Sequence, residues 1–394
     1  MPRNIVICFD GTNNEFGSHN TNVVRMVQVL DRDPQKQLVY YDAGVGTLPE
    51  PGFVTPIGKW ISKVFGLAFG AGLAGKITGA YTFLMDHYQP GDRIYLYGFS
   101  RGAYTARALA GVLYQFGLLA AGNYNLIPYV LRLQKSINDL KDGTEHAYWK
   151  VTRDFRATFA RINFEDGQAT RFVRIHFLGV WDTVSSVGWV WDPIHYPYAT
   201  RNPSVDMVRH AVALDEHRAF FIPTRWPNPG NGKQDVREIW FAGVHSDVGG
   251  GYPEADGENR GGLWRTPFLW MVRESVQAGL LIRPKAVRDI LKRTAIQRPA
   301  WANRQHESLN WKWWLAEFMP KWRWDWVRKK TLPYVNRFRR RVVPEDAELH
   351  RSLLRRLRRA ACAYEPTNLS PAFRAQVQQL TRLPPTLPYR SKAE

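Results

Sequence analysis

Short apolar runs alternate along the chain with longer segments in which apolar residues recur every three to four positions. The runs lie at residues 4–9, 37–41, 93–97, 172–181 and 238–244 and predict strands. The helical periodicity lies between them, at residues 22–30, 71–87, 103–118 and 206–214. Such an alternation predicts an α/β fold with a mostly parallel central sheet flanked by helices. Because the carboxyl ends of parallel strands meet at one edge, we expect the functional loops to leave that edge.

The most specific motif is Gly98-Phe99-Ser100-Arg101-Gly102, which stands between a predicted strand and a predicted helix rich in small residues. G-x-S-x-G in that context is typical of the nucleophile turn of α/β hydrolases. Gly98 and Gly102 allow a sharp turn, and the amino terminus of the helix favours the negative charge that develops in acyl transfer. The alternative interpretation is an ordinary tight turn in a doubly wound sheet.

A serine nucleophile also needs a histidine to take its proton and a carboxylate to orient that histidine. In α/β hydrolases the chain order is serine, acid, histidine. Asp182 directly follows the apolar residues 177–181, and His245 directly follows residues 240–244. Taken singly, Asp182 could be a helix-capping or turn residue, and His245 a loop histidine. Their order and their shared position after strands favour a catalytic triad of Ser100, Asp182 and His245 in an α/β-hydrolase-like fold.

An oxyanion hole needs two backbone N–H groups beside the serine. The first is expected from Arg101, the residue after the nucleophile. The second is expected from Gly11 or Thr12 in the loop after the first strand, where Asp10 supports the loop; an ordinary Asp-Gly turn is the alternative. This loop also resembles the start of haloacid-dehalogenase phosphatases, but Cys8 occupies the position of their nucleophilic aspartate.

Asp247 competes with Asp182 for the role of the acid. It stands two residues after His245 in a glycine-rich segment, so we expect it to fix that loop instead. No cluster of cysteine and histidine has the spacing of a metal site, and the chemistry of a serine triad requires no metal or organic cofactor.

Composition and charge add constraints on the partner and the compartment. The net charge is +19, and residues 301–394 carry 20 Lys and Arg against 8 Asp and Glu, so this quarter of the chain suits an anionic partner. Cys8 and Cys362 give no disulfide framework, which favours a reducing compartment. The chain opens without a secretory signal, and its most apolar segment, residues 64–75, is too short to span a bilayer. We therefore expect a soluble protein that is cytoplasmic as synthesised.

The character of the chain changes after residue 300. We expect residues 1–300 to form the α/β-hydrolase domain, with residues 123–167 as a helical insertion. Residues 301–382 are rich in tryptophan and arginine, and they predict a helical appendage packed on or beside that domain. An extended tail is expected at residues 383–394, which contain three prolines.

Aromatic residues of the appendage form a candidate membrane contact. Trp311, Trp314 and Phe318 fall on one predicted helical face, and Trp322 lies in an alternating run that follows. Tryptophan with arginine suits a membrane interface, because indole rings sit at the headgroup level and cations attract anionic lipids. The alternative is that these rings pack the appendage onto the domain. Nucleic acid would use the same residue types, but the chain carries no nucleic-acid-binding motif.

Four segments together resemble a known family. They are residues 9–13, 98–107, 179–184 and 243–252. They are similar to the catalytic domain of type VI secretion phospholipase effectors, over roughly residues 3–260. The resemblance implies an α/β-hydrolase fold, a triad at Ser100, Asp182 and His245, and a phospholipid substrate. For a chain that acts as an effector, it also implies delivery by a specialised secretion system and an immunity protein as partner.

The sequence thus predicts a serine hydrolase that cleaves carboxylic esters of lipids, namely a phospholipase acting on glycerophospholipids at a membrane surface. Two other functions stay open. One is a soluble carboxylesterase for small esters, and the other is a catalytically idle hydrolase fold that binds membranes or nucleic acid.

Overall fold

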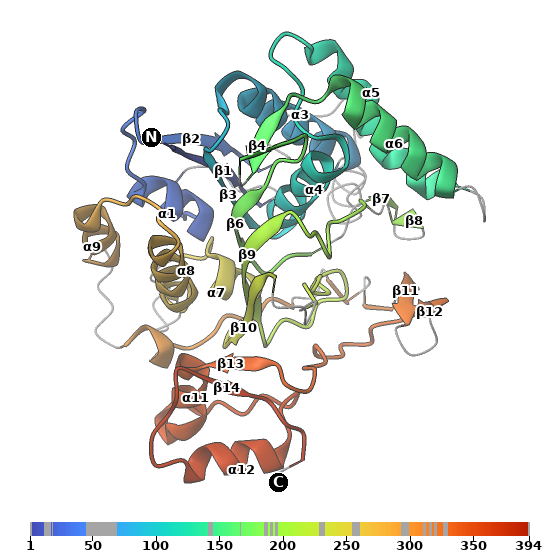
Figure 1. Cartoon of the computed structure of the whole chain (residues 1–394). Coiled ribbons are helices and arrows are strands. Elements are labelled where there is room, and N and C mark those ends of the chain that lie inside the picture. The colour runs from blue at the N-terminus through green and yellow to red at the C-terminus, as the bar shows by residue number, and fades with distance from the viewer. Residues whose placement is uncertain are drawn as a thin grey trace.

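One sheet organises the part of the chain that the computed structural model describes, namely residues 2–11, 17, 19–44, 69–140, 145–165, 167–184, 188–189, 192–193, 196–227, 233–253, 261–292, 299–309, 313–314, 317–318, 321–325 and 330–392. Among these residues, eight strands form the central sheet in the order β14-β13-β10-β9-β6-β3-β1-β2 (Figure 1). Their bounds are β1 Asn4–Phe9, β2 Gln37–Asp42, β3 Arg93–Phe99, β6 Ile175–Trp181, β9 Val205–Ala213, β10 Asp235–Phe241, β13 Glu348–His350 and β14 Thr386–Pro388. Neighbouring strands are parallel except for β13 and β14. The predicted α/β fold with a mostly parallel sheet is therefore confirmed.

Helices cover both faces of this sheet (Figure 1). Their bounds are α1 Asn22–Val29, α3 Phe69–His87, α4 Arg101–Phe116, α5 Ile127–Lys135, α6 Glu145–Phe159, α7 His245–Gly249, α8 Arg265–Gln277, α9 Pro284–Lys292, α11 Arg351–Arg358 and α12 Pro371–Gln379. In the described part of the chain, three two-stranded sheets are separate from the central sheet: β4 Asn163–Glu165 with β5 Gln168–Thr170, β7 Gly188–Trp189 with β8 Asp192–Pro193, and β11 Lys321–Asp325 with β12 Lys330–Tyr334. Elements α5, α6 and β4 lie within residues 123–167, which the sequence marks as an insertion, and β5 follows directly after that segment.

Side chains of the strands alternate between two hydrophobic cores. In β1, Ile5 and Ile7 pack in the core beneath α3, α4 and α5, whereas Val6 and Cys8 pack in the core beneath α1, α8 and α9. Burial on both faces explains why the sequence shows continuous apolar runs instead of a strict apolar–polar alternation. Cys8 is accordingly a small core residue.

The order of the strands reverses at β1. The chain runs from β1 to β2 on one side and then returns to β3 on the other side of β1. At such a reversal the loops leave the carboxyl edge in opposite directions, which is where open α/β sheets bind ligands. Ser100 follows β3 and Gly11 follows β1, so both residues stand at this edge of the sheet beside the reversal in strand order.

The prediction of a helix over residues 206–214 is wrong, because this segment forms the central strand β9. Two buried polar residues conceal its strand character. Arg209 forms ion pairs with Glu274 and Asp235, and the ring of His210 lies 3.0 Å from a Glu238 carboxylate oxygen. Because these groups are paired, polar side chains can occupy interior positions. The sequence therefore looks amphipathic at helical spacing.

The C-terminal region does not form a purely helical appendage. A third hydrophobic cluster joins Trp240 of β10 to Leu349 of β13, Leu353 of α11 and Phe373 of α12. The strands β13 and β14 extend the main sheet beyond β10, so the predicted boundary at residue 300 cuts through one continuous sheet. Strands of three residues are too short to show an alternating pattern, which is why the sequence did not reveal them.

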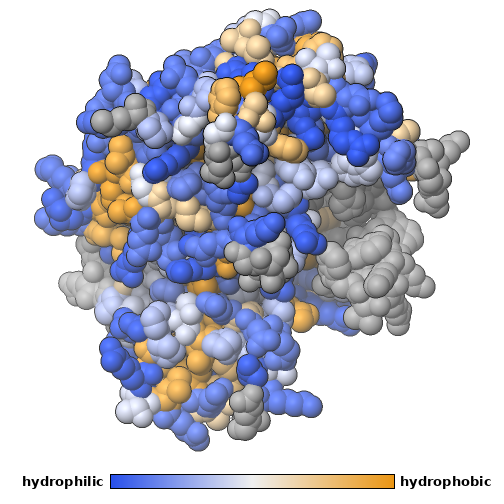
Figure 2. Space-filling model, in the orientation of Figure 1, coloured by the Kyte–Doolittle hydropathy of each residue, from blue (hydrophilic) through white to orange (hydrophobic). Residues whose placement is uncertain are grey.

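The surface in the orientation of Figure 1 is mostly hydrophilic, with hydrophobic residues gathered in several patches, one of them over the C-terminal elements (Figure 2). Among the helices of the described residues, none combines the length and the apolar character that crossing a membrane requires.

Candidate active site

The turn between β3 and α4 holds Ser100 in a strained backbone conformation. Its φ is 59° and its ψ is −125°, values that a residue with a side chain rarely adopts. Close backbone approaches surround it. A Cβ on Gly98 would lie 2.5 Å from the Cα of Ala103, and a Cβ on Gly102 would lie 2.4 Å from the carbonyl oxygen of Phe9. Both glycines are therefore required by lack of space, as expected for a turn that pushes a serine outward.

The structure brings the three predicted triad residues together. His245 Nε2 lies 2.8 Å from Ser100 Oγ, and His245 Nδ1 lies 2.5 Å from Asp182 Oδ2. All three side chains are buried. They come from the ends of three parallel strands, β3, β6 and β10, so the shared sheet edge explains how residues so distant in sequence meet. This geometry satisfies the hydrogen-bond order of a serine–histidine–acid relay.

Besides the histidine, Asp182 has a charged partner. Its backbone is left-handed, with φ 38°, and its Oδ1 accepts a hydrogen bond from the Ala213 N–H at 3.0 Å. The guanidinium of Arg341 lies against both carboxylate oxygens, at 2.6 Å from Oδ1 and 3.0 Å from Oδ2. Burial alone would raise the pKa of Asp182, but the charge of Arg341 and the hydrogen bond from His245 hold it well below its usual range.

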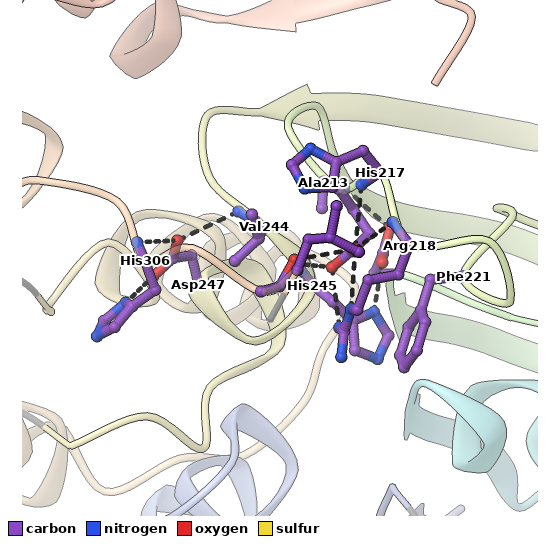
Figure 3. A network of polar contacts seen from close by, with 12 residues as sticks. Ala213, His217, Arg218, Phe221, Val244, His245, Asp247 and His306 are labelled. Carbon is purple, nitrogen blue, oxygen red and sulfur yellow. Dashed lines mark hydrogen bonds and ion pairs between the residues drawn. The ribbon is translucent and has the colours of Figure 1, made fainter. Parts of the chain in front are cut away.

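The imidazole of His245 is held between two aromatic rings. The ring of Phe99 lies 4.6 Å from it, centroid to centroid, and Phe221 meets it edge-on at 4.8 Å (Figure 3). Burial lowers the pKa of His245, although the hydrogen bond to Asp182 acts in the opposite direction. A lowered pKa keeps the imidazole neutral near pH 7, which a general base requires.

Glu216, which the sequence analysis missed, fixes the backbone of the histidine. Its Oε2 accepts a hydrogen bond from the His245 N–H at 3.1 Å, and its Oε1 accepts one from the Ser308 hydroxyl at 3.0 Å. Arg218 donates to both oxygens, at 3.0 Å and 2.9 Å. Although burial opposes ionisation, the charge of Arg218 lowers the pKa of Glu216 far below normal. Glu216 follows β9, so recognising that segment as a strand would have placed it at the functional edge.

Asp247 fixes the start of α7 and does not contact the serine–histidine pair. Its Oδ2 accepts hydrogen bonds from the N–H groups of Val244, at 3.2 Å, and His306, at 3.0 Å. The ring of His306 lies 2.6 Å from Oδ1 and stacks on Tyr252 at 3.9 Å. In Figure 3, Asp247 and His306 lie on one side of His245, and Arg218 and Phe221 lie on the other side. The supporting role of Asp247 stays a prediction, and these hydrogen bonds show what it would support, namely the start of α7 and the backbone of His306.

The candidate oxyanion hole is described only in part. Arg101 is the first residue of α4, so its backbone N–H stands at the amino terminus of the helix beside Ser100. The N–H of Gly11, however, donates to Asp10 Oδ1 at 2.7 Å, which engages the donor that the sequence assigns to the oxyanion. Thr12 lies outside the described residues.

Asp10 itself is buried at the end of β1. Its Oδ2 accepts hydrogen bonds from the hydroxyl groups of Thr21, at 2.9 Å, and Tyr41, at 3.0 Å. Burial raises the pKa of Asp10 to about 6. These contacts hold the carboxylate at the end of β1, and the supporting role of Asp10 stays a prediction.

The predicted membrane-contact residues fall into two groups. Trp314 and Phe318 are 57% and 59% exposed. Trp311 lies outside the described residues, and Trp322 lies in β11 with its side chain undescribed. Within the described part of the chain, no group of three or more His, Cys, Asp or Glu side chains is arranged to hold a metal ion.

A mostly parallel sheet, covered by helices on both faces and carrying a serine in the turn after β3, defines an α/β-hydrolase-like protein. Residues 3–274 match the family described as the catalytic domain of the type VI secretion phospholipase effector Tle1-like proteins. The chain belongs to this family, which is a family of phospholipases.

The individual proteins that are similar to this chain have low sequence identity to it or are much longer than it. An uncharacterised protein of the yeast Saccharomyces cerevisiae is 34% identical over 229 residues, which cover 56% of this chain and 32% of the yeast protein. An uncharacterised protein from Pseudomonas aeruginosa is 21% identical, with a TM-score of 0.41 over 73% of this chain and 47% of that one. A Tle1 effector bound to the VgrG spike of the type VI secretion system is 19% identical, with a TM-score of 0.31 over 64% of this chain and 51% of its own. The chain thus spans about a third of the yeast relative and about half of each solved chain.

Proposed function

We propose that the chain is a serine hydrolase that cleaves carboxylic esters of glycerophospholipids. The observation that carries this proposal is the hydrogen-bond relay, in which Ser100 Oγ lies 2.8 Å from one nitrogen of His245 and Asp182 lies 2.5 Å from the other. The family relationship supports the lipid class of the substrate.

The reaction follows from the positions of the hydrogen-bonding atoms. With its Nδ1 proton donated to Asp182, His245 has a free electron pair on Nε2 and takes the proton of Ser100 as Oγ attacks the ester carbonyl. The negative charge of the tetrahedral intermediate develops beside the Arg101 N–H. His245 then protonates the leaving alcohol, and a water molecule activated by the same imidazole hydrolyses the acyl-enzyme, which restores Ser100.

An exposed aromatic cluster favours a lipid surface as the substrate over a small soluble ester. Trp314, Phe318 and Phe338 are 57%, 59% and 39% exposed, and both of the first two rings meet Phe338 edge-on. Arg337 and Arg339, on either side of Phe338, are exposed and positively charged. Rings flanked by cations suit the headgroup region of an anionic bilayer.

The backbone that presents this cluster is itself specialised. Arg337 and Phe338 are consecutive left-handed residues, with φ 51° and 61°. The N–H of Arg337 donates to the Glu317 carbonyl oxygen, and the N–H of Phe338 donates to its carboxylate, both at 3.0 Å. Glu317 is fully buried. Two strained residues fixed by the backbone carbonyl and the side chain of one buried glutamate indicate a turn built to hold Phe338 outward.

The cluster also lies close to the candidate triad. Trp313, the neighbour of Trp314, meets Phe221 edge-on at 5.6 Å, and Phe221 in turn contacts His245. Docking of the cluster on a bilayer would therefore bring the triad to the lipid. Delivery by a secretion system, an immunity protein and a spike protein as partners are further proposals that come from the family alone.

Replacement of the nucleophile tests the proposed chemistry. Ser100→Ala is expected to lower kcat/KM on phospholipid vesicles by about 1,000-fold or more, because no other group supplies the attacking oxygen. A fluorophosphonate probe followed by peptide mapping is expected to label Ser100 in the unaltered chain. Ser136→Ala, at a serine remote from the triad, is the matched control. Labelling of a different serine, or full activity of Ser100→Ala, would refute the proposal.

A further inference from the structure

The guanidinium of Arg341 makes contacts unlike those of a surface arginine. The side chain is 5% exposed and donates one N–H···O hydrogen bond to each carboxylate oxygen of Asp182, at 2.6 Å and 3.0 Å. Its remaining donors reach the carbonyl oxygens of Ala213, at 2.7 Å, and Phe221. A planar guanidinium held on both sides in this way permits one orientation of the carboxylate only.

Arg341 also comes from an unexpected part of the chain. The family match ends at residue 274, whereas Arg341 lies in the segment between β12 and β13. Its carbonyl oxygen accepts a hydrogen bond from Asn368 Nδ2, which also donates to the Leu214 carbonyl oxygen after β9. Val343, two residues on, packs in the C-terminal hydrophobic cluster. The C-terminal region therefore determines where the guanidinium lies.

We infer that Arg341 is a positioning residue for the triad, because its guanidinium fixes both oxygens of Asp182 and so sets the direction and the strength of the hydrogen bond to His245. This inference rests on the proposed serine hydrolase activity. It also means that the catalytic centre is completed by a residue from outside the part of the chain that the family model matches.

The charges around the imidazole explain how Arg341 would act on catalysis. Two carboxylates face His245, from Asp182 and Glu216, and each is paired with a guanidinium, from Arg341 and Arg218. Asp247, on α7 itself, bonds His306 instead. Because Arg341 neutralises part of the charge of Asp182, it weakens the stabilisation of the protonated imidazole. The base consequently stays neutral, and available, at lower pH.

Removal of the Arg341 charge is expected to shift the pH dependence of the reaction. Without the guanidinium, Asp182 would stabilise the imidazolium form more strongly, so the pKa of His245 would rise. The acid limb of the kcat/KM profile reports that pKa, and it is expected to move to higher pH. An arginine that only stabilised the fold would change the melting temperature and the amount of active protein but would not move this limb.

The experiment measures labelling of Ser100 by a fluorophosphonate, and hydrolysis of a soluble p-nitrophenyl ester, across pH 5 to 9 in the full chain. Arg341→Gln is expected to slow both reactions by about 10- to 100-fold through misplacement of the acid. Its acid limb is expected to shift upward by about one pH unit. Arg341→Lys keeps the charge without the planar pair of donors, so it is expected to lose rate while the limb stays near its original pH. Arg358→Gln, at an exposed arginine of α11, is the matched control.

Each outcome bears on one proposal. If the unaltered chain neither labels at Ser100 nor hydrolyses an ester, the proposed function is wrong. If it labels and Arg341→Gln shows the same rate and the same acid limb, the inference on Arg341 is overturned. Should Arg341→Gln fail to fold by circular dichroism, Arg341→Lys decides, because an unchanged rate in that variant would show that the paired donors are not needed.

Discussion

The region matched by the family model and the C-terminal region contribute differently to the same site. Residues 3–274 supply the serine, the histidine and the acid, each from the end of a parallel strand. Residues 299–392 supply groups that contact Asp182 and its surroundings. Arg341 bonds Asp182 itself, Ser308 bonds Glu216, which accepts from the His245 N–H, and His306 bonds Asp247. The three side chains of the proposed triad therefore lie at one edge of the sheet, whereas Arg341, which bonds the acid, comes from a much later part of the chain.

The largest effect is expected from the acid of the first region. Asp182→Asn should reduce kcat on an ester substrate by about 10,000-fold, because the amide cannot hold the imidazole in the required tautomer or stabilise its protonated form. Steady-state kinetics at pH 8 measures this loss. Asp206→Asn on β9, where the carboxylate pairs with Arg174, is the matched control and should retain its rate. A loss smaller than about tenfold would assign the acid role to another residue.

An intermediate effect is expected from the aromatic cluster of the second region. The triple variant Trp314→Ala, Phe318→Ala, Phe338→Ala should weaken binding to anionic phosphatidylglycerol vesicles by about 10- to 100-fold, because it removes apolar surface from the interface. Hydrolysis of a monomeric ester should change less than about twofold, since these rings do not touch the triad.

Vesicle sedimentation and the two assays together decide the role of the cluster. Tyr124→Ala with Tyr129→Ala, at two exposed aromatic residues of the insertion, is the matched control. If the triple variant sediments with vesicles as the unaltered chain does, the aromatic cluster is not the membrane contact.

The smallest effect concerns the joint between the two regions, where Tyr364 donates to Asp215 at 2.9 Å. Burial raises the pKa of Asp215 to about 6. A carboxyl group with a raised pKa contributes stability below its unfolded value near 4, and that stability is lost as the pH rises through about 6. As the pH rises from 4 to 7, the free energy of unfolding should therefore fall by about 2 kcal/mol less in Asp215→Asn than in the unaltered chain.

Urea unfolding at several pH values measures this difference. Asp139→Asn, at an exposed carboxyl group, is the control and should keep the original pH dependence. If the free energy of unfolding depends on pH in the same way in Asp215→Asn and in the unaltered chain, the Asp215 carboxyl group does not make the stability of this contact pH-dependent.

Most of the sheet could be predicted from local pattern, and so could the meeting of Ser100, Asp182 and His245 at its edge. The apolar runs at β1 and β3 give the strands, and the Gly98–Gly102 motif gives the turn that carries Ser100. The central strand β9 could not be recognised, because the ion pairs that let Arg209 occupy the interior exist only in the folded chain. Arg341 is one of four arginines within residues 337–341, and no local signal distinguishes it from its neighbours.

The short strand β14 forms one outer edge of the sheet, and it protects that edge from pairing with other molecules. β14 has three residues, runs antiparallel to β13 and ends in Pro388, a residue that cannot donate to a further strand. It therefore discourages edge-to-edge association between molecules. A fragment cut after residue 274 would retain Ser100, Asp182 and His245, but it would expose the edge of β10 with Trp240 beside it, and self-association of that fragment would be the first property to examine.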